Sequence, residues 1–525
     1  MRLGALLLLL AARAAHAAVT PLQALVDAAL AAGAPSLTLP AGSLFTQGAA
    51  PLLITATDFL LDGNGARVVF APGAGVVIER SAGLEVRALT VEYDPPCFTQ
   101  GTVVAANQSA HPRTFDVRLD GGFAAPDSDF FTTVEIKLQF FNGSTRARVV
   151  PQSGSCIVTV AGAVAPGVWR VSESFGCAVP LPPLDGGGGL RATISPRVNG
   201  PAYQIPGGYV GGAWWVFNSS NVTTRDVTLL GSGNFAISEW GGGGGHLYDG
   251  VVLTRDEARG ALLSSNTDGF HSFAVAAGPT LTRARLSWMG DDVANVHNRV
   301  GVVLGARALP SGALAVSIID VGDTPTPRLD PADPARALAA ARPGDALKVT
   351  SAAGVPRGGA PGGSLVLAAI AWDTTPATVA AARAAIAARG GVAVDPRGVG
   401  VWAAVFEPPA ALDIVPGDIT QFDRFSGAGV RVTDSVFTDA YDSCFRLQAS
   451  GAVIARNVWA RTNGGVSVVY DADWLEGASD IANVAVDGNE FHAVGFPPAS
   501  SAAQIFNVQK TVVNFTQAGN AVLPA

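Results

Sequence analysis

Three aspartates lie close together in this sequence and suggest acid and base chemistry. Asp268 is followed by a glycine, and the adjacent pair Asp291 and Asp292 is preceded by one. The offset of 23 residues between Asp268 and Asp291 is about one turn of a coiled parallel β architecture, in which residues one repeat apart stack side by side. Carboxylates held that close cannot all ionise at their usual pKa, so one becomes a proton donor while its neighbours stay ionised. Hydrolysis of a glycosidic bond requires this division of roles.

Polar side chains flank the three aspartates. Residues 292–297 alternate as a strand does, but strict alternation would bury the charge of Asp292. We therefore expect the strand to start after Asp292, with the aspartate pair in a turn eased by Gly290. By the same alternation Asn266 shares a face with Asp268 and is expected to orient its carboxylate. The candidate substrate-binding residues nearest to the aspartates are Asn266, His271, Asn295 and His297.

Two simpler interpretations apply to the same residues. Asn-Thr-Asp-Gly and Gly-Asp-Asp are each common in turns, and three carboxylates can also hold a calcium ion. Their combination one repeat apart, followed by Asn295 and His297, favours catalysis, and nothing in the sequence suggests a bound metal or other cofactor.

Glu239 is a further candidate substrate-binding residue. It stands shortly before five glycines, Gly241 to Gly245, which lack the Lys-Ser/Thr of a phosphate-binding loop. Such a run of glycines allows another surface or a sugar to approach the backbone closely.

The composition indicates an ordered, exported protein. Of the 525 residues, 48% are hydrophobic, 14% are charged and 62 are glycines, which argues against disorder and indicates a structure built by repetition. Residues 1–17 combine a basic start, a short apolar core and a small-residue pattern that ends at Ala17, as in a secretory signal peptide. The apolar run is shorter than the roughly 20 residues of a membrane span, so we expect a secreted protein without a membrane partner. A net charge of −8 argues against a nucleic-acid partner.

The cysteines and glycosylation sequons fit export. Four cysteines are sparse and lack paired metal-ligand spacing, and we expect a disulfide between Cys156 and Cys177. Five sequons predict a glycoprotein in a eukaryotic source, at Asn107, Asn142, Asn218, Asn221 and Asn514.

Short β-like runs separated by Gly, Asn and Asp recur at roughly 20 to 30 residues, without helices between them. They lie at residues 59–61, 68–70, 76–78, 84–86, 221–229, 249–253, 280–286, 430–437, 452–459 and 484–491. This recurrence excludes a doubly wound α/β sheet and predicts an all-β protein, a right-handed parallel β-helix. Residues 21–32, followed by Gly33, are expected to form a short helix that caps the N-terminal end of the β-helix.

Two stretches break the repeat and predict inserted β-rich domains. One alternates as antiparallel strands do, and the other contains an alanine-rich helix that begins at Pro376, with Thr375 as its N-cap. The predicted organisation is a signal peptide (1–17), the first β-helix part (18–97), the first insertion (98–200), central coils with the active site (201–300), the second insertion (301–419) and the C-terminal coils (420–525).

These residues resemble those of glycoside hydrolases built on a parallel β-helix. Asn266-Thr267-Asp268 followed by Asp291-Asp292 looks like the polygalacturonase signature, although the Gly-His-Gly and Arg-x-Lys motifs of that family are missing. The α-1,3-galactosidase family is more similar, through Asp268-Gly269, the run from Gly290 to His297, and the late segments around Arg446 and Glu476. The resemblance implies that Asp291 is the catalytic acid, that Asp268 and Asp292 activate water, and that Arg446 and Glu476 bind substrate.

We therefore expect a secreted, inverting glycoside hydrolase that removes terminal α-galactose-like sugars from a glycan. An inverting mechanism predicts acid and base carboxylates roughly 6.5 to 9.5 Å apart, whereas about 5 Å is typical of retention. One alternative is a polysaccharide lyase, which needs calcium and a strong base near the carboxylates; no lysine lies near them in sequence. The other is a non-catalytic carbohydrate-binding or wall-associated protein.

Overall fold

The computed structural model describes residues 21–127, 136–149, 156–175, 189–196, 212–298, 300–321, 341–351, 357, 364–373, 375–389, 399–407, 414–422, 426–440, 445–469, 476–477, 481–494, 505–509 and 512–523. Almost all regular structure within these ranges is β. The helices are α2 (Pro21–Ala31), α3 (Pro376–Arg389) and the short 3-10 helix η2 (Glu257–Arg259). The signal peptide predicted at residues 1–17 lies outside the described residues.

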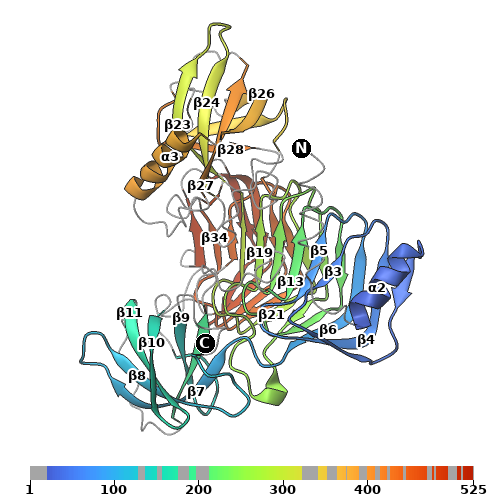
Figure 1. Ribbon diagram of the computed structural model, residues 1–525, viewed down its shortest axis with the longest axis vertical. Coiled ribbons are helices and arrows are strands. Elements are labelled where there is room, and N and C mark those ends of the chain that lie inside the picture. The colour runs from blue at the N-terminus through green and yellow to red at the C-terminus, as the bar shows by residue number, and fades with distance from the viewer. Residues whose placement is uncertain are drawn as a thin grey trace.

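Two parallel sheets wind around a common core and form a parallel β-helix (Figure 1). The nine-stranded sheet, on which the candidate site lies, contains β3 (Leu52–Ile54), β5 (Val76–Glu79), β13 (Trp214–Phe217), β16 (Ile237–Trp240), β19 (Phe270–Phe273), β22 (Ala294–His297), β31 (Phe445–Leu447), β34 (Val466–Val468) and β37 (Phe506–Val508).

The second sheet has 18 strands, and most coils contribute two strands to it. Its strands are β1 (Ser36–Thr38), β2 (Leu44–Gly48), β4 (Leu60–Phe70), β6 (Glu85–Tyr93), β14 (Thr223–Arg225), β15 (Thr228–Leu230), β17 (Leu247–Asp249), β18 (Val252–Leu253), β20 (Thr280–Thr282), β21 (Arg285–Ser287), β29 (Arg431–Thr433), β30 (Val436–Thr438), β32 (Val453–Ala455), β33 (Val458–Ala460), β35 (Ala482–Asp487), β36 (Glu490–His492), β38 (Val513–Ala518) and β39 (Ala521–Leu523).

The repeat is stable because each coil buries one apolar row against its neighbours. Val432 in β29, for example, pairs with Leu281 in the preceding coil and Ile454 in the next, and all three belong to one continuous core. A single coil of three short strands could not bury these side chains alone, so the coils stabilise one another. The predicted all-β fold class, a parallel β-helix with additional β domains, is confirmed.

Two closed antiparallel barrels interrupt the coils. The first barrel contains β7 (Thr99–Asn107), β8 (Thr114–Leu119), β9 (Ile136–Asn142), β10 (Cys156–Ala165), β11 (Val168–Phe175) and β12 (Leu190–Pro196). The second contains β23 (Gly301–Ala308), β24 (Leu314–Val321), β25 (Ala346–Thr350), β26 (Ser364–Asp373), β27 (Val399–Phe406) and β28 (Ile419–Phe422). The exact domain boundaries stay predictions.

Both barrels pack on the β-helix, at opposite ends of the view in Figure 1. In the first, Gln100 donates to the carbonyl of Gly260 and accepts from the amide of Leu262, at 3.1 and 2.9 Å. The second barrel shares an apolar cluster with the outer face of the nine-stranded sheet, which includes Trp240 and Phe273. The barrels therefore frame the part of that sheet that carries the predicted site.

Several smaller predictions can be compared with the described residues. Helix α2 ends at Ala31, and the amide of Gly33 donates to the carbonyl of Leu30 with the glycine in a left-handed conformation, as expected for its cap. Cys156 is disulfide-bonded, but Cys177 lies outside the described residues, so the pairing stays a prediction. Within the described ranges, no helix is both long and apolar enough to cross a membrane.

Candidate active site

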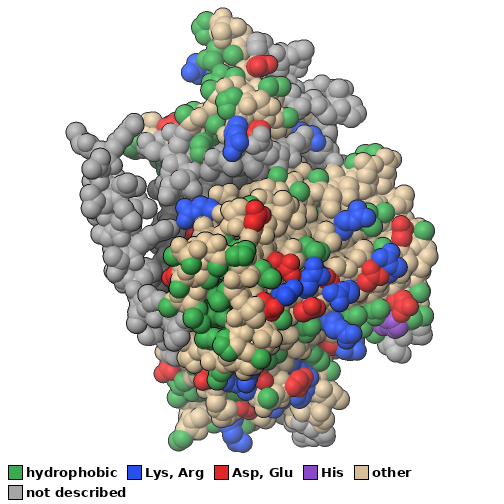
Figure 2. All heavy atoms as spheres, turned by 90° about the vertical axis from the view of Figure 1, so that its right-hand side faces the viewer, with side chains coloured by type: hydrophobic (Ala, Val, Ile, Leu, Met, Phe, Trp, Pro, Cys, Tyr) green, Lys and Arg blue, Asp and Glu red, His purple; other side chains and the backbone are tan. Residues whose placement is uncertain are grey.

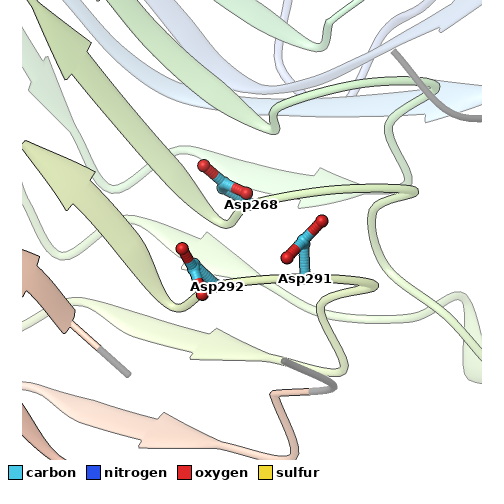
Figure 3. Close-up of side chains that lie close together, drawn as sticks. All are labelled: Asp268, Asp291 and Asp292. Atoms are coloured by element: carbon cyan, nitrogen blue, oxygen red, sulfur yellow. The ribbon is translucent and has the colours of Figure 1, made fainter. Parts of the chain in front are cut away.

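The register of the coils brings the three aspartates together. Phe270 pairs with Ala294, and the amide of Gly269 donates to the carbonyl of Asp292 at 3.0 Å. Asp268 therefore lies directly over Asp292, and Asp291 lies beside both (Figure 3). The sequence offset of 23 residues predicted that Asp291 stacks on Asp268. The structure shifts this register by one residue, so that Asp292 stacks on Asp268.

The three carboxylates are closer than an inverting mechanism predicts. One oxygen of each lies within 4.8 Å of the corresponding oxygens of the other two. Neighbouring strands of a sheet are about 4.7–4.9 Å apart, so carboxylates on adjacent coils adopt that spacing. These oxygens therefore approach one another more closely than the roughly 6.5 to 9.5 Å between carboxyl groups that an inverting mechanism predicts.

A turn, and not a strand, presents the aspartate pair. Strand β22 begins at Ala294, after Asp291 and Asp292, as the sequence predicts. A Cβ atom on Gly290 would lie 2.6 Å from the carbonyl oxygen of Asn266, which is closer than real Cβ contacts. Glycine at this position therefore allows the turn to pack closely against the backbone of Ser265 and Asn266 in the preceding coil, and this packing fixes the position of the two carboxylates.

Lys137, in strand β9 of the first barrel, belongs to the site. Its Nζ atom forms an ion pair with Asp291, and its side chain is fully buried. The side-chain amide of the neighbouring Gln139 donates to the carbonyl of Gly290 at 2.8 Å. The first barrel therefore also contacts the backbone of the turn that carries Asp291 and Asp292. Sequence reasoning missed Lys137 because 154 residues separate it from Asp291, and the only local signal was its position within a strand of the first inserted domain.

Burial and the charge of Asp291 together favour the protonated form of Asp268. Burial is the largest cause that raises the pKa of Asp268 well above its usual value, and the nearby charge of Asp291 raises it further. The charges of Lys137 and Arg446 oppose this shift without cancelling it. Asp268 is 6% exposed, so water does little to screen these interactions.

Two histidines extend from Asp268 along the outer face of the sheet. His271 Nδ1 lies 2.8 Å from Asp268 Oδ2, and its Nε2 lies 3.0 Å from Nε2 of His297. Each ring is stacked on a phenylalanine: His271 on Phe235, with centroids 4.0 Å apart, and His297 on Phe273, at 5.5 Å. Both predicted histidines thus lie within the site, in orientations set by aromatic contacts.

Three more predicted residues gather beside the histidines. Asn295 pairs in register with His271 on one side and with Arg446 on the other. The amide of Asn295 donates to Glu476 Oε2 at 3.1 Å, and Arg446 lies between Glu476, at 3.7 Å, and Asp292, at 4.0 Å. Burial alone would raise the pKa of Glu476, but the charge of Arg446 and the hydrogen bond from Asn295 help to lower it below its usual value. Arg446 and Glu476 therefore form a charged rim next to the aspartates.

Asn266 does not orient Asp268, contrary to the prediction. Its side-chain amide donates to the carbonyls of Cys97 and Gly233, at 2.9 and 3.2 Å. Both amide hydrogens are therefore engaged elsewhere, and the contact to Asp268 comes from His271. Strand β19 begins only at Phe270, so the alternation of a strand does not apply to Asn266.

Glu239 was also predicted to bind substrate, and its position contradicts this. It points into the β-helix with no exposed surface, and it accepts hydrogen bonds from Ser272 Oγ at 2.5 Å and the Tyr248 hydroxyl at 3.1 Å. Burial raises the pKa of Glu239 to about 8. Within strand β16 it shares the core-facing row with Ile237, whereas Trp240 faces outward. Glu239 is therefore a core residue.

A tryptophan face can serve as a platform for a sugar ring, but the rings of Trp214, Trp215 and Trp288 are all covered. Trp214 and Trp215 are buried, at 0% and 1% exposure. The guanidinium of Arg255 covers the ring of Trp288, 3.7 Å from its centroid. Trp474 lies outside the described residues.

The spacing of the three carboxylates would also suit a cation, but the site already contains compensating charge. Lys137 pairs with Asp291, and Arg446 approaches Asp292. We therefore assign no metal ligands. The arrangement combines a buried carboxyl group that favours its proton, a carboxylate paired with an ammonium group, and a charged rim, which together suit acid and base catalysis on a polar substrate.

Comparison with known proteins gives no family. No protein-family model and no curated protein matches the sequence. Among solved structures, a mutant tailspike protein of E. coli bacteriophage HK620, in complex with a pentasaccharide, is 9% identical, with a TM-score of 0.32; the match covers 96% of this chain and 59% of that chain. This chain thus spans about three fifths of that tailspike.

Two further solved structures are similar at the same low level. The A-module of the Azotobacter vinelandii mannuronan C-5 epimerase AlgE4 is 10% identical, with a TM-score of 0.25 and coverage of 95% of this chain and 92% of that one. The tailspike protein gp49 of Pseudomonas phage LKA1 is 9% identical, with a TM-score of 0.16 and coverage of 96% and 69%. Similarity this weak carries no inference about the reaction, so the function is argued from the geometry.

Proposed function

We propose that this protein is a glycoside hydrolase and that Asp268 is its catalytic acid. The observation that carries the proposal is the contrast between two neighbouring carboxyl groups: burial raises the pKa of Asp268, whereas Asp291 is paired with the ammonium group of Lys137. Two carboxyl groups in such different environments are what protonation of a glycosidic oxygen and stabilisation of the developing positive charge require.

In this proposal Asp268 protonates the leaving oxygen, and Asp291 or Asp292 either activates water or attacks the anomeric carbon. This exchanges the roles that the family resemblance implies, because there Asp291 is the acid. The short carboxylate spacing favours retention of configuration, whereas the resemblance implies inversion. The configuration of the first product distinguishes these two routes.

The substrate is proposed from the rim and the resemblance together. Arg446 and Glu476 offer charged partners for sugar hydroxyl groups, and the resemblance extends the proposal to terminal α-galactose-like sugars on a glycan. We further propose that the protein is secreted, because all five sequon asparagines are exposed, as glycosylation would need.

The test is hydrolysis of a panel of aryl α- and β-glycosides and galactose-capped oligosaccharides. Product configuration is followed by proton NMR in wild type, Asp268→Asn and Asp291→Asn, with Asp434→Asn as the matched control on the opposite sheet. We expect each site variant to lose about 10²- to 10⁴-fold in kcat/KM and the control to keep full activity. Full activity in Asp268→Asn with a large loss in Asp291→Asn would return the acid role to Asp291.

Lys137 favours one alternative, a polysaccharide lyase. A lyase removes the proton next to the carboxylate of a uronic acid, and a lysine beside an acidic cluster is a candidate base or charge neutraliser for that step. In the sequence no lysine lies near the aspartates, which spoke against a lyase. In the folded protein Lys137 lies beside Asp291, so this objection no longer applies. An unsaturated product that absorbs in the ultraviolet, formed from uronic-acid polymers and abolished by a chelator, would establish the lyase and refute the hydrolase.

A further inference from the structure

We infer that Asp268, His271 and His297 form a hydrogen-bonded chain that holds one shared proton, with His271 as the positioning residue through which the chain acts on Asp268. The catalytic consequence of this inference rests on the proposed function, but the proton count does not.

The backbone of Asn298 fixes one proton. His297 Nδ1 lies 2.9 Å from the carbonyl oxygen of Asn298, and a carbonyl oxygen only accepts hydrogen bonds. His297 therefore carries a hydrogen on Nδ1. If this ring is neutral, its Nε2 carries a lone pair.

The next contact needs a second proton. Nε2 of His297 and Nε2 of His271 are 3.0 Å apart, which is a hydrogen-bond distance between two nitrogens. One of the two must donate. If His271 Nε2 donates and the ring is neutral, its Nδ1 accepts, and the hydrogen in the 2.8 Å contact with Asp268 must come from the carboxyl group.

The same proton can lie elsewhere without breaking the chain. It can move from Asp268 to His271, giving a carboxylate and an imidazolium, or on to His297. In each of these arrangements every contact has one hydrogen, and the net charge of the three groups is zero. Loss of that proton leaves one of the three contacts without a hydrogen: the His271 Nδ1 lone pair then faces the Asp268 carboxylate, or two lone pairs face each other at Nε2, or a lone pair faces the Asn298 carbonyl. The geometry therefore fits the three groups only with the shared proton present.

The surroundings shield the hydrogen-bonded chain of Asp268, His271 and His297 from water, and the charges of the groups around it nearly balance. His271 and His297 are 4% and 5% exposed, and the rings of Phe235 and Phe273 cover their faces. The charged groups that face the chain are Asp291 and Asp292 from the turn, Glu476 from its loop, Lys137 from the first barrel and Arg446 from β31. The raised pKa of Asp268 agrees with a proton that the site retains.

In catalysis the hydrogen-bonded chain would favour reprotonation of Asp268 after each turnover. Asp268 gives its proton to the glycosidic oxygen as the bond from that oxygen to the anomeric carbon breaks, and the three groups are left with one negative charge. Water supplies the hydroxyl group of the new sugar end, and its proton passes to a carboxylate and then to solvent. The contact left without a hydrogen favours recapture of one proton, which restores Asp268 for the next turnover.

The test of the proton count is NMR of the full chain labelled with ¹⁵N-histidine, with no substrate needed. At neutral pH we expect a strongly deshielded imidazole N–H signal that is protected from exchange. It should disappear in His271→Gln and in His297→Gln and remain in His492→Gln, a histidine on the opposite sheet. Nitrogen shifts in wild type that show both Nε2 atoms without hydrogen would overturn the inference, whether or not the variants fold.

The test of the catalytic consequence is the pH profile of kcat/KM on the best substrate of the glycoside panel. Glutamine at position 297 can turn either its amide or its oxygen toward His271, so it should tolerate loss of the proton. We expect His297→Gln to move the basic limb down by about one pH unit, with kcat changed less than the profile. An unchanged profile, with the NMR signal lost, would refute the catalytic role alone, and absence of hydrolysis with the signal intact would refute only the proposed function.

Discussion

Replacement of the buried Glu239 by glutamine should change how stability depends on pH, and it should leave the reaction intact. Glu239 lies inside the β-helix, where burial raises its pKa from 4.5 to about 8. Between these values the folded chain holds a proton on Glu239 that the unfolded chain has lost. Since the folded state binds more protons there, stability falls as pH rises through this interval.

The magnitude follows from the size of the shift. One pKa unit corresponds to about 1.4 kcal/mol, so ionisable Glu239 destabilises the fold by about 3 kcal/mol at pH 7 and by about 5 kcal/mol above pH 8. Glutamine carries no charge in either state and removes this term. Below about pH 4.5 only the exchange of hydrogen bonds with Ser272 and Tyr248 remains, at about 1 kcal/mol.

The assay is the thermal denaturation midpoint of wild type and Glu239→Gln from about pH 4 to pH 9, with Glu490→Gln as an exposed control. The difference between Glu239→Gln and wild type should rise steadily with pH and level off above about pH 8. The control should give a flat difference, and glycan hydrolysis should be unchanged in Glu239→Gln. A difference in thermal midpoint that does not change with pH would refute the assignment of Glu239 to the core. A loss of substrate affinity in Glu239→Gln would instead support the predicted role of Glu239 in substrate binding.

Three further outcomes are expected. Lys137→Met should lower kcat/KM by about 10²-fold or more while the protein remains folded by circular dichroism, because Lys137 forms an ion pair with Asp291, whereas Lys348→Met, in the second barrel, should have no effect. Gly290→Ala should lower both thermal stability and activity, because its new Cβ would meet the Ser265 carbonyl at 2.7 Å and displace the turn; a fully active variant would contradict the tight packing. Removal of divalent cations by a chelator should leave hydrolysis unchanged, and a loss restored by calcium would instead favour the lyase.

The sequence alone predicted the repeat and the main members of the site. Rows such as Val432 and Ile454 recur with small polar turns between them, and no compact α/β sheet accommodates that pattern. The three aspartates and the two histidines were found because they lie on adjacent coils, so that nearness in sequence becomes nearness in space. Local chemistry also placed helix α2 and the start of strand β22.

Other features were decided only by the tertiary structure. The exact register, which places Asp268 over Asp292, depends on coil length, and coil length varies: Phe270 pairs with Ala294, 24 residues later, whereas Ile237 pairs with Phe270, 33 residues later. The inward direction of Glu239 depends on which row of β16 faces the core, and both rows of that strand are buried. Lys137 enters the site because a whole barrel folds back onto the turn at Gly290, and no local pattern encodes a contact across 154 residues. The sequence determined which residues could act as acids, and the packing of distant segments decided which of them is expected to keep its proton.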